Sequence, residues 1–143
     1  MTKNASKIPP FHYSFKMKDH ESTRKFYVDI LGCEEGRSNE TWLDFDFFGH
    51  QVTAHLSDKF PELDYCGLVD GVAVPIPHFG VILSLKDYTK VKEALEHHQY
   101  PFIVKPQVRY PGKPEEQHTL FIIDPSGNPL EFKSYSGTEN DFI

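Results

Sequence analysis

The chain repeats one pattern of secondary structure, and each copy opens on a short alternating strand that carries a histidine. The first such strand covers residues 11–15 and contains His12, and the second covers 77–83 and contains His78. In both, apolar side chains recur with the two-residue period of a half-buried strand. The strand and the helix after it occupy nearly the same length in both halves. We therefore interpret the chain as a duplicated unit.

A helix is predicted after each of these strands. In the first half Asp19 is the expected N-cap, an apolar stripe follows at helical spacing, and Gly32 ends the helix. In the second half Asp87 is the expected N-cap, and the apolar stripe runs out near 98–100. Each helix has a single apolar stripe, so it must lie on one face of a sheet.

Further strands are predicted after each helix, so each half follows the order strand, helix, strand, strand, strand. The fold class is therefore α+β, with one domain over 1–143 made of two βαβββ modules. The first module spans 10–56, a Pro- and Gly-rich linker that should be irregular spans 57–76, the second module spans 77–135, and a tail spans 136–143. The later strands are expected at 41–48, 51–56, 102–104, 108–110, 119–123 and 130–135, with a turn at 124–128.

Composition excludes several classes of function. The net charge of −6 argues against a nucleic-acid partner, because neutralising phosphates requires concentrated Lys and Arg. Cys33 and Cys66 have neither disulfide-framework nor thiolate-zinc spacing. The first residues lack the apolar run of a signal peptide, and no segment is long enough to span a membrane. We expect a soluble cytoplasmic protein with no membrane partner.

Three polar residues fall on the strand faces turned away from the helices. On the first strand Phe11, Tyr13 and Phe15 should face the helix, which leaves His12 on the other side. The same parity places His78 and Glu131 opposite the apolar residues of their own strands.

If the two halves form one curved sheet, two imidazoles and one carboxylate meet in its concave cup. This donor set is typical of non-haem Fe(II) oxygenases and also accepts Mn, Co, Ni or Zn. A carboxylate on such a face needs a cation. The alternative for Glu131 is an ion pair with a nearby Lys or Arg.

The sequence resembles the vicinal oxygen chelate superfamily, which includes glyoxalase I, the fosfomycin and bleomycin resistance proteins and the extradiol dioxygenases. The resemblance covers about 11–135 and is most specific in the segment 124–132, DPSGNPLEF; the segments 22–32 and 78–81 add to it. It implies the glyoxalase/bleomycin resistance/dihydroxybiphenyl dioxygenase fold, whose two modules enclose a metal-binding cup. It also implies that the metal ligands are His12, His78 and Glu131.

The resemblance further implies a fourth ligand position on the last strand of the first module, where the glyoxalase I branch usually carries a Glu. His55 lies near that place, and we consider it a candidate acid/base, with direct ligation less favoured. Tyr110 and His118 are further acid/base candidates.

Other side chains are candidates for substrate binding. Aromatic residues suit a planar or apolar substrate and suit a packed core equally well. Arg109 lies in a segment that could cap the cup and hold a substrate carboxylate, although a solvated hairpin loop is the simpler interpretation. The aromatic candidates are Trp42, Phe45 or Phe47, and Phe121.

The functional prediction is a divalent-metal-dependent enzyme whose small substrate chelates the metal through vicinal oxygens. An extradiol-type Fe(II) dioxygenase using O₂ is favoured. The alternatives are a glyoxalase I-like lyase or isomerase, a fosfomycin-type thiol transferase, and a bleomycin-resistance-like binding protein without chemistry. Homodimerisation is expected by analogy with the family, with the site formed within one chain or across two.

Overall fold

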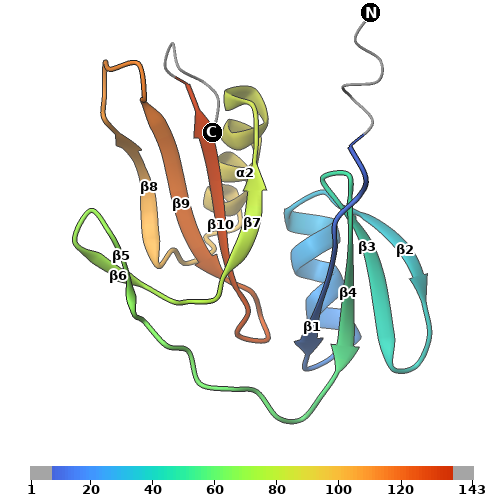
Figure 1. Ribbon diagram of the computed structural model, residues 1–143. Helices are drawn as coiled ribbons and strands as arrows, with labels where there is room; N and C mark the ends of the chain where they lie inside the picture. The colour runs from blue at the N-terminus through green and yellow to red at the C-terminus, as the bar shows by residue number, and fades with distance from the viewer. Residues whose placement is uncertain (1–7, 137–143) are drawn as a thin grey trace, which may run out of the picture. The chain divides into compact units, whose positions relative to one another are not determined.

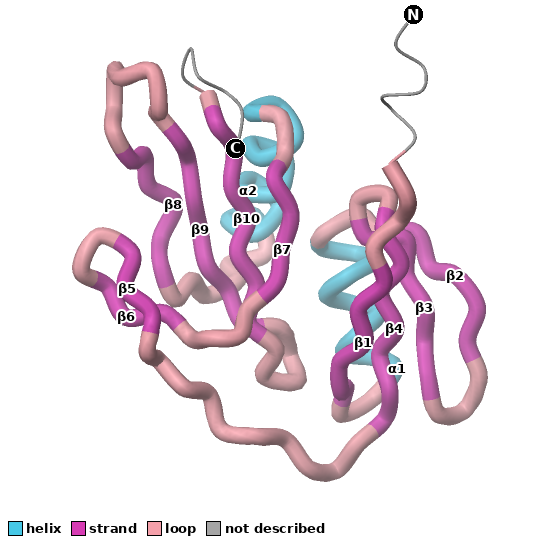
Figure 2. Tube along the Cα trace, in the orientation of Figure 1, coloured by secondary structure: helices cyan, strands magenta, loops and turns pink. Residues whose placement is uncertain are grey.

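The computed structural model describes residues 8–136 of the chain, which divides into two compact units, 1–58 and 59–143. Figures 1 and 2 show that each unit places helix against one face of its own sheet. Within the described residues, no helix is long and apolar enough to cross a membrane.

The first unit is a βαβββ module. Its four strands form a sheet in the order β1-β4-β3-β2, in which β1 and β4 run parallel and the other pairs antiparallel (Figure 1). The elements are β1 (His12–Met17), α1 (His20–Arg24), a π-helical continuation η1 (Lys25–Ile30), β2 (Glu34–Ser38), β3 (Trp42–Phe47) and β4 (His50–Leu56).

The helix of the first unit has the predicted ends. Asp19 accepts a hydrogen bond from the Ser22 amide at 2.6 Å and so caps the N-terminus. Gly32 follows the last turn with a φ of 79°, a left-handed conformation that favours glycine. The ring of Tyr27 stacks between Phe15 and Phe45, with ring centres 5.4 and 5.1 Å away, so the helix packs on the face that alternation predicts. Phe11 was expected on that face too, but it precedes β1 and is 67% exposed.

The second unit repeats the module and adds a hairpin. Its main sheet has the order β7-β10-β9-β8, with β7 and β10 parallel and α2 packed on one face (Figure 1). The elements are β5 (Gly67–Val69), β6 (Val72–Val74), β7 (Phe79–Ile82), α2 (Leu85–His97), β8 (Val104–Arg109), β9 (Gln117–Ile123) and β10 (Pro129–Tyr135).

Two local predictions for the second unit are wrong and one is confirmed. Helix α2 is capped by Ser84, whose hydroxyl accepts from the Asp87 amide at 3.2 Å, so Asp87 is the third helical residue. The two expected strands near 102–110 are one strand, β8, because a register shift accommodates Pro106 at the sheet edge. The turn after β9 forms as predicted, with Asp124 accepting from the amides of Ser126 and Asn128 at 2.8 and 2.9 Å.

The expected irregular linker contains the β5–β6 hairpin. Its turn is Asp70-Gly71, with φ of 49° and 82°, and two positive φ values are typical of the tight turn that matches strand twist. Val74 of the hairpin packs with Val104 and Phe121 of the main sheet. The hairpin therefore covers part of the sheet face opposite α2.

Candidate metal centre

The second unit brings His78 and Glu131 together. The Nε2 atom of His78 lies 3.2 Å from Oε1 of Glu131, and both side chains are mostly buried. Glu131 is on β10, whose residues Leu130 and Phe132 are fully buried on the α2 side. Strict alternation along β10 therefore turns Glu131 to the opposite face, as predicted.

The orientation of the His78 ring is fixed by contacts with Pro75 and Phe121. Its Nδ1 atom donates a hydrogen bond to the carbonyl oxygen of Pro75 at 2.7 Å, and its ring meets Phe121 edge-on with centres 4.9 Å apart. Both partners of the ring are hydrogen-bond acceptors, so both ring nitrogens donate in the protonated ring, and a metal ion at Nε2 would take the place of that proton. The bond to Glu131 accordingly raises the pKa of His78, against the opposing effect of burial.

Two further groups act on the Glu131 carboxylate. The hydroxyl of Thr119, itself buried, donates to Oε2 at 2.6 Å, and the ammonium of Lys133 lies 3.9 Å from the same oxygen. Burial raises the pKa of Glu131, but the hydrogen bonds from His78 and Thr119 and the charge of Lys133 outweigh it, and the pKa is lower than usual. Glu131 is therefore a carboxylate with one oxygen held by Thr119 and the other turned to His78.

The His78–Glu131 pair fits a divalent metal. Two ligands each about 2.0–2.2 Å from one ion, at tetrahedral or right angles, lie roughly 2.9–3.4 Å apart. The observed separation of 3.2 Å is within that range. An Nδ1 bond to a backbone carbonyl and a hydrogen bond to the ligating carboxylate are the supports that metal sites commonly show.

The third predicted ligand belongs to the first unit. His12 is exposed on β1, with Nε2 3.2 Å from the hydroxyl of Ser14. Across residues 8–136, no three His, Cys, Asp or Glu side chains are gathered as a metal would need. The participation of His12 therefore stays a prediction.

Strand register identifies the first-unit counterpart of Glu131. Ser14, two residues after His12, pairs with Thr53, whereas Gly80, two residues after His78, pairs with Glu131. Thr53 is therefore the counterpart of Glu131 in the first unit, and His55 is two residues further along.

The first unit nevertheless has a buried carboxylate beside this position. The hydroxyl of Thr53 donates to Oδ1 of Asp44 on β3 at 2.6 Å, and Gln51 lies 3.4 Å from the other oxygen. Asp44 was not among the sequence candidates. Asp44 stands between the buried residues Leu43 and Phe45 on β3, and this alternation was the signal that could have placed its side chain on the sheet face away from the helix.

Two candidates share the His12 face. In the sheet, His55 pairs with Lys16 on one side and with Trp42 on the other, in the alternation set that includes His12. His55 is exposed and Trp42 half-buried. Their predicted roles remain compatible with their position.

The expectation that His118 and Phe47 line the cup is not met. His118 pairs with Ser134 on the α2 side of its sheet, where its ring lies 5.7 Å from that of Tyr88. Phe47 is buried against Tyr27 on the helix side of the first sheet, with ring centres 6.4 Å apart. Both residues belong to the wrong alternation set for the proposed site.

The remaining candidates have structural partners. Arg109 forms an ion pair with Asp70 of the hairpin at 3.2 Å, and its guanidinium lies 5.3 Å from the ring centre of Tyr110. Tyr110 is 44% exposed just after β8. Phe121 pairs with Glu131 on the correct face, but it is fully buried, in part against Val74 of the hairpin. Phe121 therefore supports His78, and Arg109 holds the hairpin.

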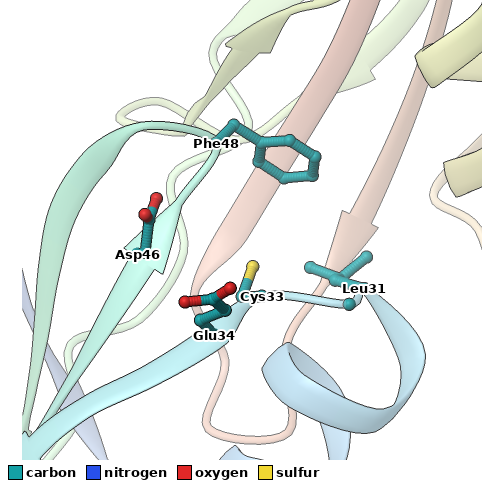
Figure 3. A pocket seen from close by; sticks show the side chains of 6 residues that line it. Leu31, Cys33, Glu34, Asp46 and Phe48 are labelled. Atoms are coloured by element: carbon teal, nitrogen blue, oxygen red, sulfur yellow. The ribbon is translucent and has the colours of Figure 1, made fainter.

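A pocket of about 200 Å³ in the first unit is a separate feature (Figure 3). Its lining includes Cys33, Glu34, Asp46 and Phe48. Burial, with a contribution from Asp46, raises the pKa of the Cys33 thiol to about 12. The thiol is therefore protonated at neutral pH and unsuited to ligation or nucleophilic attack.

The fold is that of a protein built from two βαβββ modules, with His78 and Glu131 side by side in the second. The sequence matches no protein-family model and no curated protein. It is similar to the crystal structure of a glyoxalase/bleomycin resistance protein/dioxygenase from Alicyclobacillus acidocaldarius, with 32% identity over 90% of this chain and 92% of that one and a TM-score of 0.73. The chain belongs to the glyoxalase/bleomycin resistance protein/dioxygenase family.

More distant structures share the fold. The fosfomycin resistance protein FosX from Listeria monocytogenes is 16% identical over 92% of this chain and 97% of that one, with a TM-score of 0.67. A glyoxalase/dioxygenase from Nostoc punctiforme is 14% identical over 85% of this chain and 87% of that one, with a TM-score of 0.63. The predicted α+β fold of two modules is thus confirmed.

Proposed function

We propose that the protein is a divalent-metal-dependent enzyme whose small substrate binds the metal through two neighbouring oxygens. His78 and Glu131 would be two of the ligands, and His12 would be the third, from the same chain or from a second copy in a homodimer. The observation that carries this proposal is the 3.2 Å approach of His78 to Glu131, a mostly buried carboxylate whose pKa is lower than usual. Membership of the family supports it.

The residues of the chain would prepare the site as follows. The Pro75 carbonyl would hold Nδ1 of His78 so that Nε2 faces Glu131, and Thr119 would hold Oε2 of Glu131 so that Oε1 faces His78. Phe121 and the hairpin exclude water from one side of the pair. A bound divalent cation would supply Lewis-acid stabilisation of negative charge on the substrate oxygens. His55, exposed on the His12 face, is the proposed acid/base that moves a substrate proton.

The finer proposal is an extradiol-type dioxygenase that uses Fe(II) and O₂. Two histidines and one carboxylate are the donor set typical of non-haem iron oxygenases. Thr53 at the fourth position supports a three-ligand set, since a neutral hydroxyl already bonded to Asp44 is a poor ligand. The lyase, isomerase or transferase reactions of the same superfamily are the alternative outcome of the test.

Metal analysis of anaerobically purified protein tests this proposal. We expect about one divalent ion per chain, with iron retained and oxygen consumed when a catechol is added. Nickel, zinc or manganese without oxygen uptake would replace the dioxygenase by the alternative reactions. Absence of binding for each of these metals in calorimetric titration would refute a metal-dependent function altogether.

Thr119 should affect metal affinity although it is not a ligand. Thr119→Val keeps the size of the side chain but removes the 2.6 Å hydrogen bond to Glu131. Loss of such an outer contact weakens metal binding by about 10- to 100-fold. Titration with Mn²⁺ measures this effect, and Thr119→Ser, which keeps the hydroxyl, should restore affinity. Equal affinities in the Val and Ser variants would contradict this role.

A further inference from the structure

Lys133 lies beside the proposed metal pair on the same face of the sheet. It follows Glu131 by two residues on β10 and pairs with Thr119 on β9, so all three side chains share one alternation set. Its ammonium is 3.9 Å from Oε2 of Glu131 and 5.6 Å from the ring centre of Tyr135. A positive charge is thus fixed next to the place where the cation would bind.

The contact with Glu131 does not satisfy the Lys133 ammonium. A separation of 3.9 Å is too long for a hydrogen bond, and the same oxygen already accepts from Thr119 at 2.6 Å. The Lys133 side chain is 27% exposed and carries three donors. Arg109, another cation of this face, is engaged by Asp70. Lys133 is therefore positioned to receive an anion from outside.

A bound metal would make an anion beside Lys133 more favourable. A divalent cation beside Glu131 leaves a net positive charge at the pair, and the Lys133 ammonium adds another within a few ångströms. Two such charges on a partly buried face repel each other unless an anion lies between them. A substrate oxyanion that touches both would satisfy each of them.

We propose that Lys133 selects substrates that carry an oxyanion, a carboxylate or a phosphonate, next to the oxygen that chelates the metal. This inference rests on the proposed metal-dependent function and names its substrate class. It assigns Lys133 a role in substrate binding, with no part in holding the metal. A neutral chelator would bind the metal without using Lys133.

Calorimetry on Mn²⁺-loaded protein tests the proposal with matched probes. Glycolate and glycolamide both offer a hydroxyl and a carbonyl oxygen, and they differ in charge. Lys133→Met should weaken glycolate binding about 10-fold or more, which corresponds to loss of one charge-assisted hydrogen bond. Glycolamide binding should be unchanged, and Lys133→Arg should keep glycolate binding. Hydroxymethylphosphonate distinguishes the two anions, because the tighter binder identifies the preferred group.

The direction in which Lys133→Met changes Mn²⁺ affinity distinguishes a role in substrate binding from a general loss of structure. Removing a positive charge near a cation site should leave Mn²⁺ affinity equal or higher in Lys133→Met. Unchanged glycolate binding, or a parallel loss of Mn²⁺, glycolate and glycolamide, would overturn the proposal while the metal-dependent function stands. Failure of the wild-type protein to bind Mn²⁺, Fe²⁺, Ni²⁺ or Zn²⁺ would instead refute that function, and this inference with it.

Discussion

Glu131→Gln should abolish the proposed binding of a divalent metal while leaving the protein folded. The substitution removes the charge that binds the cation but keeps the volume of the side chain, and the amide oxygen can still accept from Thr119. Loss of a ligand exceeds the effect of losing an outer contact, so we expect metal affinity to fall by at least about 100-fold. Metal content after dialysis and calorimetric titration measure this loss.

The control for this variant is a carboxylate away from the pair. Glu96 is exposed on α2 and forms an i,i+4 pair with Lys92 at 3.3 Å, so Glu96→Gln should keep the metal. Thermal unfolding of both variants should stay close to that of the wild type. If Glu131→Gln retained metal and activity, Glu131 would be only the partner of His78 and Lys133, and the metal-centre assignment would be wrong.

Gly80→Ala should be strongly destabilising. Gly80 of β7 pairs with Glu131 of β10, and a Cβ atom on Gly80 would lie 1.6 Å from the Glu131 carbonyl oxygen. The clash is with backbone, so no rotamer change relieves it and the two strands must separate. We expect a loss of about 3 kcal/mol or more in the free energy of unfolding, roughly 10 °C or more in melting temperature.

The same variant should also weaken metal binding, because His78 precedes Gly80 by two residues and moves with it. Gly36→Ala is the matched control. A Cβ atom on Gly36 would lie 3.1 Å from the Cβ atom of Asp44, and Gly36 belongs to the edge strand β2, which can shift. Its effect on unfolding should be under about 1 kcal/mol. Similar stabilities of Gly80→Ala and the wild type would show that the close approach of β7 and β10 is not required.

The sequence signals that worked were local. Alternation on the strands placed Phe15, Leu130 and Phe132 toward the helices and turned Glu131 the other way. Capping chemistry placed Asp19 at a helix start, and the Asp124 turn formed as its residue types predict. The Asp70-Gly71 pair was also a local hairpin signal, and reading the surrounding segment as irregular overlooked it.

The two misplaced candidates, His118 and Phe47, have different causes. In β9 both alternation sets are apolar, since Leu120 and Ile122 face α2 while Phe121 is covered by the hairpin. Alternation alone therefore could not decide which face His118 occupies. On β3 the alternation was clear. Trp42 and Phe47 are an odd number of residues apart and face opposite sides of the sheet, so both could not contact the same substrate.

By itself, the sequence determined the duplicated α+β architecture and the position of one histidine at the start of each module, because two-residue and helical periods follow the chain. His12 opens β1, whereas His78, expected within a strand, lies just before β7. Only the tertiary structure decided that Thr119 and Lys133 both reach Glu131, that Thr53 is the counterpart of Glu131 in the first unit, and that Arg109 holds a hairpin. These contacts depend on the register between strands distant in sequence. Register depends on the hydrophobic patterns of both partner strands and on the turns between strands, so no single strand specifies it.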